Sequence, residues 1–162
     1  MTTLRRYHTI TLRPHPLQFV IDELILIVLC LSALAYGGMD GIFFKEFMYV
    51  GFALLLFLLY KYVKLRRTIY TITGEQFRKT EGVFTRDDDY IELYRVVDFA
   101  EHKNLLQQLF GLKTVTLFSG DRTTPKINVL GVKKSCDLVA IIRERVEYTK
   151  TQKPVYEITN RY

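Results

Sequence analysis

The sequence contains few of the residues that build covalent cross-links or thiolate metal centres. Only two of its 162 residues are cysteines, Cys30 and Cys136, and Cys30 lies inside a long apolar run. Two cysteines so far apart exclude a disulfide framework, and they do not form a metal-binding cluster. This cysteine usage agrees with a soluble part that lies in the reducing cytoplasm.

Patterns typical of catalysis are also missing. His102 follows Glu101, but the sequence places no serine or cysteine that could use this histidine as a base. The run of Asp87, Asp88 and Asp89 lacks the alternate spacing, the glycine and the distal glutamate of a calcium loop. We interpret the run as a solvated loop or a charged sheet edge that blocks aberrant pairing. The sequence therefore predicts a protein that is not an enzyme and that uses no cofactor and no metal.

The chain is basic, but it contains no recognisable nucleic-acid motif. It has 23 Lys and Arg residues against 17 Asp and Glu residues, which gives a formal net charge of +6. All of the excess falls after residue 60, where acidic and basic residues are interspersed. We therefore expect no nucleic-acid partner, and we expect the excess charge to face the anionic lipid of a membrane surface.

Two long apolar runs occupy the N-terminal part of the chain, Leu24–Tyr36 and Phe47–Tyr60. Asp22 and Glu23 directly precede the first run, and an acidic residue at the bilayer centre costs about 3 kcal/mol, so these two belong in the headgroup layer. A helix over the first run and the three residues after it would rise roughly 24 Å, which a thinned bilayer accommodates. The pattern predicts a two-helix transmembrane hairpin over residues 24–63.

Basic residues flank this hairpin on the side of both chain ends. Three arginines precede the first run, and the loop between the runs has no basic residue before Lys45. The basic residues that follow the second run are Lys61, Lys64, Arg66 and Arg67. The positive-inside rule then places both termini in the cytoplasm. Because anionic lipid attracts juxtamembrane Lys and Arg by about 1 kcal/mol each, we predict that the four residues after the second run contact lipid headgroups.

Two other interpretations of the apolar runs stay open. Residues 33–35, Ala-Leu-Ala, look like a signal-peptide cleavage site, although acidic residues precede the first run and a second run follows it. Alternatively, charged residues at the ends of the runs form an intramembrane ion or proton relay. The residues concerned are Asp22, Glu23, Lys45 and Glu46.

After Arg67 the hydrophobic pattern changes from a helical to an alternating period, which is typical of strands. A short helix is expected at Asn104–Phe110, and a final amphipathic helix is expected after Ser135. Several strands followed by one such helix describe an α+β module. The expected strands are residues 68–73, 76–81, 85–94, 96–101, 113–119 and 126–130, and the apolar stripe of the final helix is Leu138, Ile141, Ile142 and Val146.

The order of these elements resembles that of bacterial membrane-flanked proteins with a pleckstrin-homology-like (PH-like) domain. The resemblance covers roughly Leu24–Tyr148, and it is carried by Ile91–Leu93 with Arg95–Asp98 and by the leucine-rich turn Leu105–Leu112, spaced as in that family. It implies an α+β fold in which a bent antiparallel sheet or barrel is closed by a C-terminal helix. It also implies a multi-pass protein of the bacterial inner membrane, with this domain on the cytoplasmic face.

The chain then divides into four parts. These are an N-terminal cytoplasmic tail (1–23), the transmembrane hairpin (24–63), the PH-like domain (66–148) and a C-terminal tail (149–162).

Both tails contain short segments of alternating or β-prone residues. We predict that either segment adds a strand to an open sheet edge, in the same chain or in a neighbour. A tail with no partner is the alternative. The residues concerned are Tyr7, Ile10 and Leu12 in the first tail, and Val155 and Ile158 in the second.

Three functions are compatible with this organisation. The protein is a membrane-anchored scaffold or adaptor, a sensor of anionic lipid, or a small subunit of a transport or secretion complex that uses Asp22 and Glu23. Thr73–Gln76, the short turn between the first two strands, carries an acidic residue, which disfavours specific phosphoinositide binding. We favour the scaffold, assembled as a homo-oligomer or with other proteins of a membrane complex.

Overall fold

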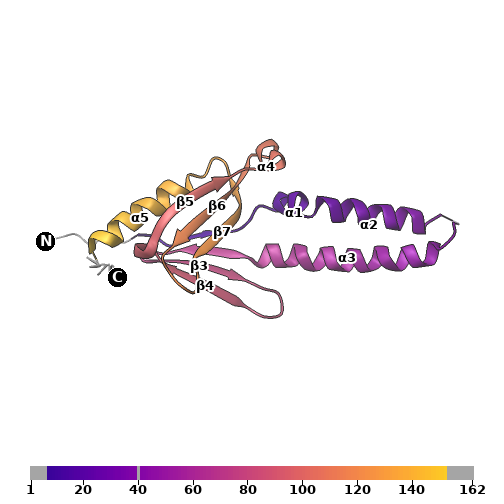
Figure 1. Ribbon diagram of the computed structural model, residues 1–162, viewed down its shortest axis with the longest axis horizontal. Coiled ribbons are helices and arrows are strands. Elements are labelled where there is room, and N and C mark those ends of the chain that lie inside the picture. The colour runs from indigo at the N-terminus through magenta and orange to yellow at the C-terminus, as the bar shows by residue number, and fades with distance from the viewer. Residues whose placement is uncertain (1–6, 40, 153–162) are drawn as a thin grey trace, which may run out of the picture.

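The computed structural model describes residues 7–39 and 41–152. In this part of the chain, a domain of seven strands carries a helical hairpin that projects from one end (Figure 1). The strands are β1 (Ile10–Leu12), β2 (Ile69–Ile72), β3 (Gln76–Glu81), β4 (Asp87–Glu92), β5 (Val96–His102), β6 (Leu112–Ser119) and β7 (Lys126–Lys133). The helices are α1 (Leu17–Asp22), α2 (Leu24–Gly37), α3 (Phe44–Arg67), α4 (Leu105–Leu109) and α5 (Leu138–Gln152), and the 3-10 turn η1 (Leu93–Arg95) joins β4 to β5. We call α2 and α3 the hairpin, and the strands with α5 the sheet domain.

The strands form two antiparallel sheets with the orders β1-β2-β3-β4 and β5-β6-β7. Alternate residues of the strands point into one core, and α5 covers that core with three of the four residues of the predicted stripe, all except Ile141. The core side chains include Ile72, Phe77 and Ile91 of the first sheet, Val115, Leu117 and Val129 of the second, and Leu138, Ile142 and Val146 of α5. The predicted α+β class is therefore confirmed. Of the expected bent sheet or barrel, a closed barrel is not formed, because across the described residues no ladder joins the two sheets.

The first sheet includes a strand that precedes the hairpin. β1 pairs with β2, with Thr11 opposite Thr71, so α1, α2 and α3 are inserted between two neighbouring strands. Ile10 and Leu12 pack against the core. Part of the segment assigned to a separate N-terminal tail therefore belongs to the sheet domain.

A buried arginine of α5 holds this N-terminal strand to the rest of the domain. Arg145 is 4% exposed, and its guanidinium donates to the carbonyl oxygens of Ile72, Thr73 and His8, each at 2.8 Å. The same guanidinium lies 5.2 Å from the ring centre of Tyr7. Burial lowers the pKa of Arg145, but three charge-assisted hydrogen bonds replace the lost hydration.

The two hairpin helices pack closely through small residues. A side chain at Gly51 would place its Cβ 2.5 Å from Cδ2 of Leu34, and Cys30 Sγ lies 3.5 Å from the carbonyl oxygen of Gly51. A Cβ at Gly37 would approach the backbone nitrogen of Met48 to 2.9 Å. Small residues at helix contacts allow such close approach of two backbones.

Helix lengths in the described residues support only one of the two predicted membrane spans. α3 has 24 residues and rises about 36 Å, and among the described helices it alone is long and apolar enough to cross a membrane. α2 has 14 residues and rises about 21 Å, short of a hydrocarbon core of about 30 Å. The helix begins at Leu24 as expected, but it is shorter than the expected first span because α2 ends at Gly37. Helix length therefore does not support the multi-pass assignment.

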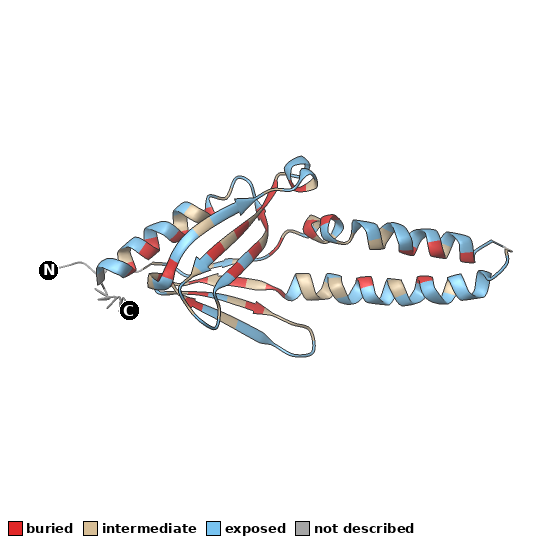
Figure 2. Cartoon of the chain, in the orientation of Figure 1, coloured by how far each residue is buried: buried red, intermediate tan, exposed pale blue. Residues whose placement is uncertain are grey.

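The surface of the hairpin is apolar and exposed. Only 11% of the apolar stretch of α3 is buried, whereas the core helix of a soluble protein would be mostly covered. Ile25 is 75% exposed, Leu31 62% and Leu56 67%, and Figure 2 shows that exposed residues dominate both helices. A contiguous apolar surface of this length marks an interaction surface.

Candidate functional site

The end of α3 and two other segments form a basic groove beside the hairpin. Arg66 and Arg67 are the last residues of α3. Arg13 directly follows β1, and the antiparallel register of β1 and β2 brings it beside the start of β2, since Leu12 lies opposite Tyr70. Arg86 comes from the loop between β3 and β4. Three segments that are distant in the sequence thus contribute four arginines.

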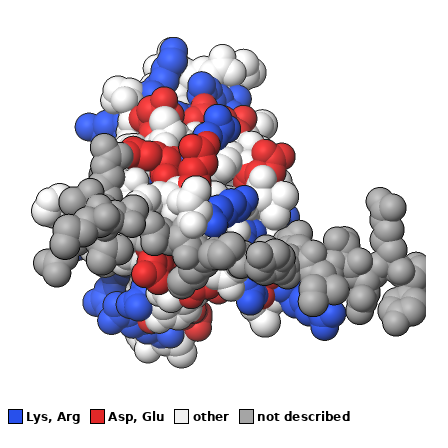
Figure 3. Space-filling model, turned by 90° about the vertical axis from the view of Figure 1, so that its left-hand side faces the viewer, with Lys and Arg blue, Asp and Glu red and all other residues white. Residues whose placement is uncertain are grey.

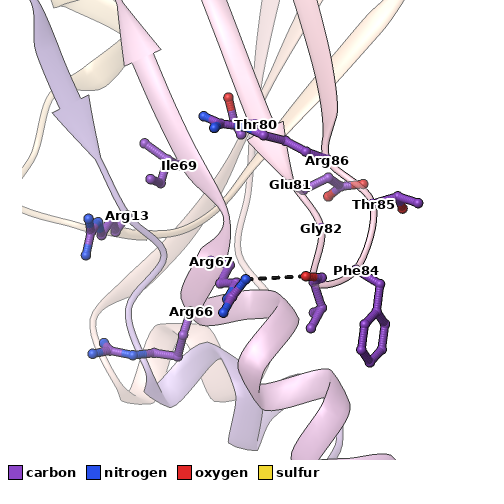
Figure 4. A pocket seen from close by; sticks show the side chains of 11 residues that line it. Arg13, Arg66, Arg67, Ile69, Thr80, Glu81, Gly82, Phe84, Thr85 and Arg86 are labelled. Atoms are coloured by element: carbon purple, nitrogen blue, oxygen red, sulfur yellow. Dashed lines mark hydrogen bonds between the residues drawn. The ribbon is translucent and has the colours of Figure 1, made fainter.

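The groove has a volume of about 370 Å³. Arg66 and Arg13 lie on the β1 side of it, Arg67 lies between the end of α3 and the β3–β4 loop, and the side chain of Arg86 extends from that loop toward Thr80 (Figure 4). Within residues 7–39 and 41–152, none of these four arginines has an ion-pair partner. A guanidinium presents a fork of donors that matches the oxygens of a phosphate group, so the groove suits an anionic ligand.

Glu81 is the acidic residue in the wall of the groove, and lysines neutralise it. Its carboxylate lies 2.8 Å from Lys79 Nζ and 3.9 Å from Lys64 Nζ. The groove therefore keeps the charge of its arginines. The end of the molecule away from the hairpin has a different charge distribution, because basic and acidic side chains are mixed there (Figure 3).

The β3–β4 loop is fixed against α3 by its backbone. Arg67 Nη1 donates to the carbonyl oxygen of Val83 at 3.3 Å, drawn as the dashed line in Figure 4. Gly82 has φ of +129°, and a Cβ there would lie 1.9 Å from the carbonyl oxygen of Thr85. Only glycine fits this position.

The same loop carries an exposed aromatic residue. Phe84 is 91% exposed, and its ring stacks on Tyr60 of α3 with the ring centres 6.2 Å apart and the planes at 11°. The contact places the tip of the loop beside the apolar part of the hairpin. In membrane proteins, aromatic side chains are enriched where bilayer and water meet.

The four basic residues predicted to contact the membrane do not form one patch. Lys61 is ion-paired with Glu23 at 2.8 Å, and Lys64 approaches Glu81. Arg66 and Arg67 line the groove. The prediction missed Arg13 and Arg86, which are isolated in the sequence. Recognising that residues 10–12 pair with β2 would have found the first of them.

Asp22 and Glu23 lie at the base of the hairpin, beside the groove. They line a second cleft of about 190 Å³ together with Lys61, Lys64 and Lys79. Burial raises the pKa of Asp22, while a hydrogen bond of 2.8 Å from Gln18 Nε2 and the charge of Lys61 oppose this rise. The acidic residues therefore have polar and basic neighbours at the end of the apolar surface.

The residues proposed for strand addition have separate positions. Ile10 and Leu12 lie in β1, and the ring of Tyr7 packs edge-on against Tyr148 of α5 with the ring centres 5.3 Å apart. Val155 and Ile158 lie outside the described residues. No group of three or more histidine, cysteine or acidic residues that could hold a metal ion occurs in the part of the chain that the structure describes.

Two antiparallel sheets closed by a C-terminal helix, with a basic groove beside the hairpin, are typical of a PH-like interaction module. The model of the bacterial PH domain family matches residues 20–146, so the chain belongs to this family. The PH-like fold predicted from the order of elements is thus confirmed. No curated protein and no solved structure matches the chain.

Proposed function

We propose that the protein is a membrane-anchored PH-like module whose basic groove binds the headgroup of an anionic lipid. The observation that carries the proposal is the position of four arginines at the base of an exposed apolar hairpin. In this arrangement the sheet domain lies on the cytoplasmic side of the bacterial inner membrane. A PH-like module interacts with proteins or lipids, and the groove favours lipid as the ligand.

The dimensions of α3 support insertion of the hairpin into a bilayer. Lys45 and Lys61 bound the apolar part of α3, and the sixteen residue steps between them rise about 24 Å. The hydrocarbon core is about 30 Å thick, and long lysine side chains and local thinning absorb a mismatch of this size. Each exposed Leu, Ile or Phe contributes about 0.5 kcal/mol to insertion.

The position of the groove along α3 supports a headgroup ligand. Arg66 and Arg67 follow Lys61 by five and six residues, which places their backbone about 8–9 Å farther along the helix axis. The headgroup layer is roughly 5–8 Å thick on each side of the hydrocarbon core. If Lys61 and Glu23 lie at the edge of the core, the long arginine side chains reach the lipid phosphates.

Alkaline extraction tests the anchor. We expect the full-length chain, produced in a bacterium, to stay in the membrane pellet after a carbonate wash, because the apolar surface of the hairpin remains in lipid. Replacing Leu56 and Leu59 by lysine should release a large fraction of the protein. Complete release of the unmodified chain would overturn the proposal of an anchor.

Titration of the full-length protein in detergent tests the ligand. We expect short-chain phosphatidic acid to bind and to raise the unfolding temperature, as any ligand of the folded state does. Short-chain phosphatidylcholine, which has no net charge, is the control. Inorganic phosphate separates recognition of the phosphate from recognition of a lipid. Equal binding of the neutral lipid would show that the arginines do not select the ligand.

An assembly role is the second candidate function. β5 is an outer strand of its sheet in the described structure, and Val97 on this strand is 73% exposed. An exposed edge strand is a surface onto which another chain can add. Size analysis in detergent tests this role, and Val97→Lys should dissociate an oligomer held through this edge. A monomeric unmodified chain would argue against self-assembly.

A further inference from the structure

We infer that α4 is a second membrane contact, which lies in the headgroup layer of the bilayer that holds the hairpin. α4 has an outer face of large apolar side chains: Leu105 is 83% exposed, Leu109 77% and Phe110, which follows the helix, 44%. Leu105 and Leu109 are four residues apart, so they share one face of the helix. This inference rests on the proposed insertion of the hairpin.

Hydrogen bonds fix which face of α4 points outward. Asn104 and Gln107 form a reciprocal capping box, with bonds of 2.7 Å and 3.1 Å between side chain and backbone. Gln107 is 2% exposed, and its Nε2 donates to Gln18 Oε1 at 3.0 Å and to Thr114 Oγ1 at 2.9 Å. With Gln107 held inside, Leu105 must face outward.

The same bonds place α4 beside the base of the hairpin. Gln18 lies in α1, five residues before Glu23, which is a rise of about 7–8 Å along a helix. If Glu23 and Lys61 mark the edge of the hydrocarbon core, α4 is held at the level of the headgroups, a layer roughly 5–8 Å thick. Figure 1 shows α4 next to α1, on the opposite side of the hairpin from the β3–β4 loop.

The charge around α4 agrees with a lipid partner. Phe110 borders a shallow hollow that is also lined by His15, Lys133 and Lys134. An apolar tip with adjacent lysines is the composition of interfacial membrane contacts, in which the apolar face enters the boundary between headgroups and acyl chains. Phe84 and α4 thus flank the hairpin as two apolar contacts of one membrane-facing end.

A tryptophan reporter tests this contact, because the sequence contains no tryptophan. The full-length Leu109→Trp variant is reconstituted into phosphatidylglycerol and phosphatidylcholine vesicles, with or without phosphatidylcholine brominated at a shallow acyl position. We expect a shift of the emission to shorter wavelength and loss of most of the emission in the brominated vesicles. Adding Leu105→Gln to this variant should reduce the quenching.

Two matched variants make the outcome decisive. Val97→Trp places the reporter at the far end of β5, on a side chain that is 73% exposed, and should give no quenching. Leu56→Trp places it in the hairpin and should be strongly quenched. Quenching of Leu56→Trp without quenching of Leu109→Trp would overturn the inference and leave the anchor standing. Loss of quenching in both would overturn the anchor as well.

The remaining outcome concerns a protein partner. If the Leu109→Trp reporter is shielded from aqueous acrylamide but is not quenched by brominated lipid, a protein covers α4, and the assignment to lipid is overturned. A reporter quenched by bromine and shielded from acrylamide supports it.

Discussion

Replacing Arg13 and Arg86 together by glutamine tests the basic groove with little risk to the fold. Neither side chain has a hydrogen bond or ion pair within the described part of the chain, so the unfolding temperature should not change. Each cation near an anionic lipid contributes about 1 kcal/mol, so the pair contributes about 2 kcal/mol. That free energy corresponds to about 30-fold weaker binding.

Isothermal titration of the detergent-solubilised full-length chain with short-chain phosphatidic acid measures this change. The control is Arg122→Gln with Lys126→Gln, which removes the same charge from the turn and strand at the other end of β6. If the control weakens binding as much as the groove variant, the lipid responds only to net charge. That result would refute the assignment of the groove as the binding site. Binding through the groove should also depend less on salt in the variant.

Three further predictions concern the sheet domain, each measured by thermal or denaturant unfolding in detergent. Replacing Arg145 by methionine should cost about 3 kcal/mol of unfolding free energy, because buried carbonyl oxygens such as that of Ile72 lose a charged donor; an unchanged stability would contradict the role of this arginine. Burial raises the pKa of Tyr70 to about 12, so the folded state keeps a proton that the unfolded chain loses above pH 10. The unfolding free energy should therefore fall between about pH 10 and pH 12, by up to about 3 kcal/mol. The Tyr70→Phe variant should lack this part of the pH dependence. An equal fall in the variant and the unmodified protein would refute the role of Tyr70. Gly82→Ala should destabilise the β3–β4 loop by about 2 kcal/mol, since the new Cβ meets the carbonyl oxygen of Thr85. If this variant binds lipid at full strength, the conformation of the loop is not needed for lipid binding.

Local patterns in the sequence predicted much of the sheet domain. The spacing of Leu138, Ile142 and Val146 predicted the buried face of α5, and alternation predicted the strands from β2 to β7 within a few residues. These patterns depend on neighbouring residues, so a single sequence contains them. How the strands close into a tertiary structure does not follow from these patterns. The strands form two separate sheets where a single bent sheet or barrel was expected.

The candidate site was harder to predict because distant segments assemble it. Arg66 and Arg67 follow an apolar run and were found by position. Arg13 and Arg86 have no local signal, because strand pairing across the whole hairpin brings the first to the groove, and a loop between two strands brings the second. The pairing of β1 was left open between this chain and a neighbour, since an edge strand fits either.

Insertion of the hairpin between β1 and β2 has a consequence for biogenesis. More than fifty residues separate Leu12 from Ile69, so the ribosome releases β1 long before its partner strand exists. Closing a loop of that length costs about 3–4 kcal/mol of chain entropy when it is flexible. If the hairpin inserts as proposed, the paired ends of its two helices hold the two strands near each other, and most of that cost is removed. Membrane entry should therefore precede completion of the first sheet, and a chain that misses the bilayer should expose an unfinished edge.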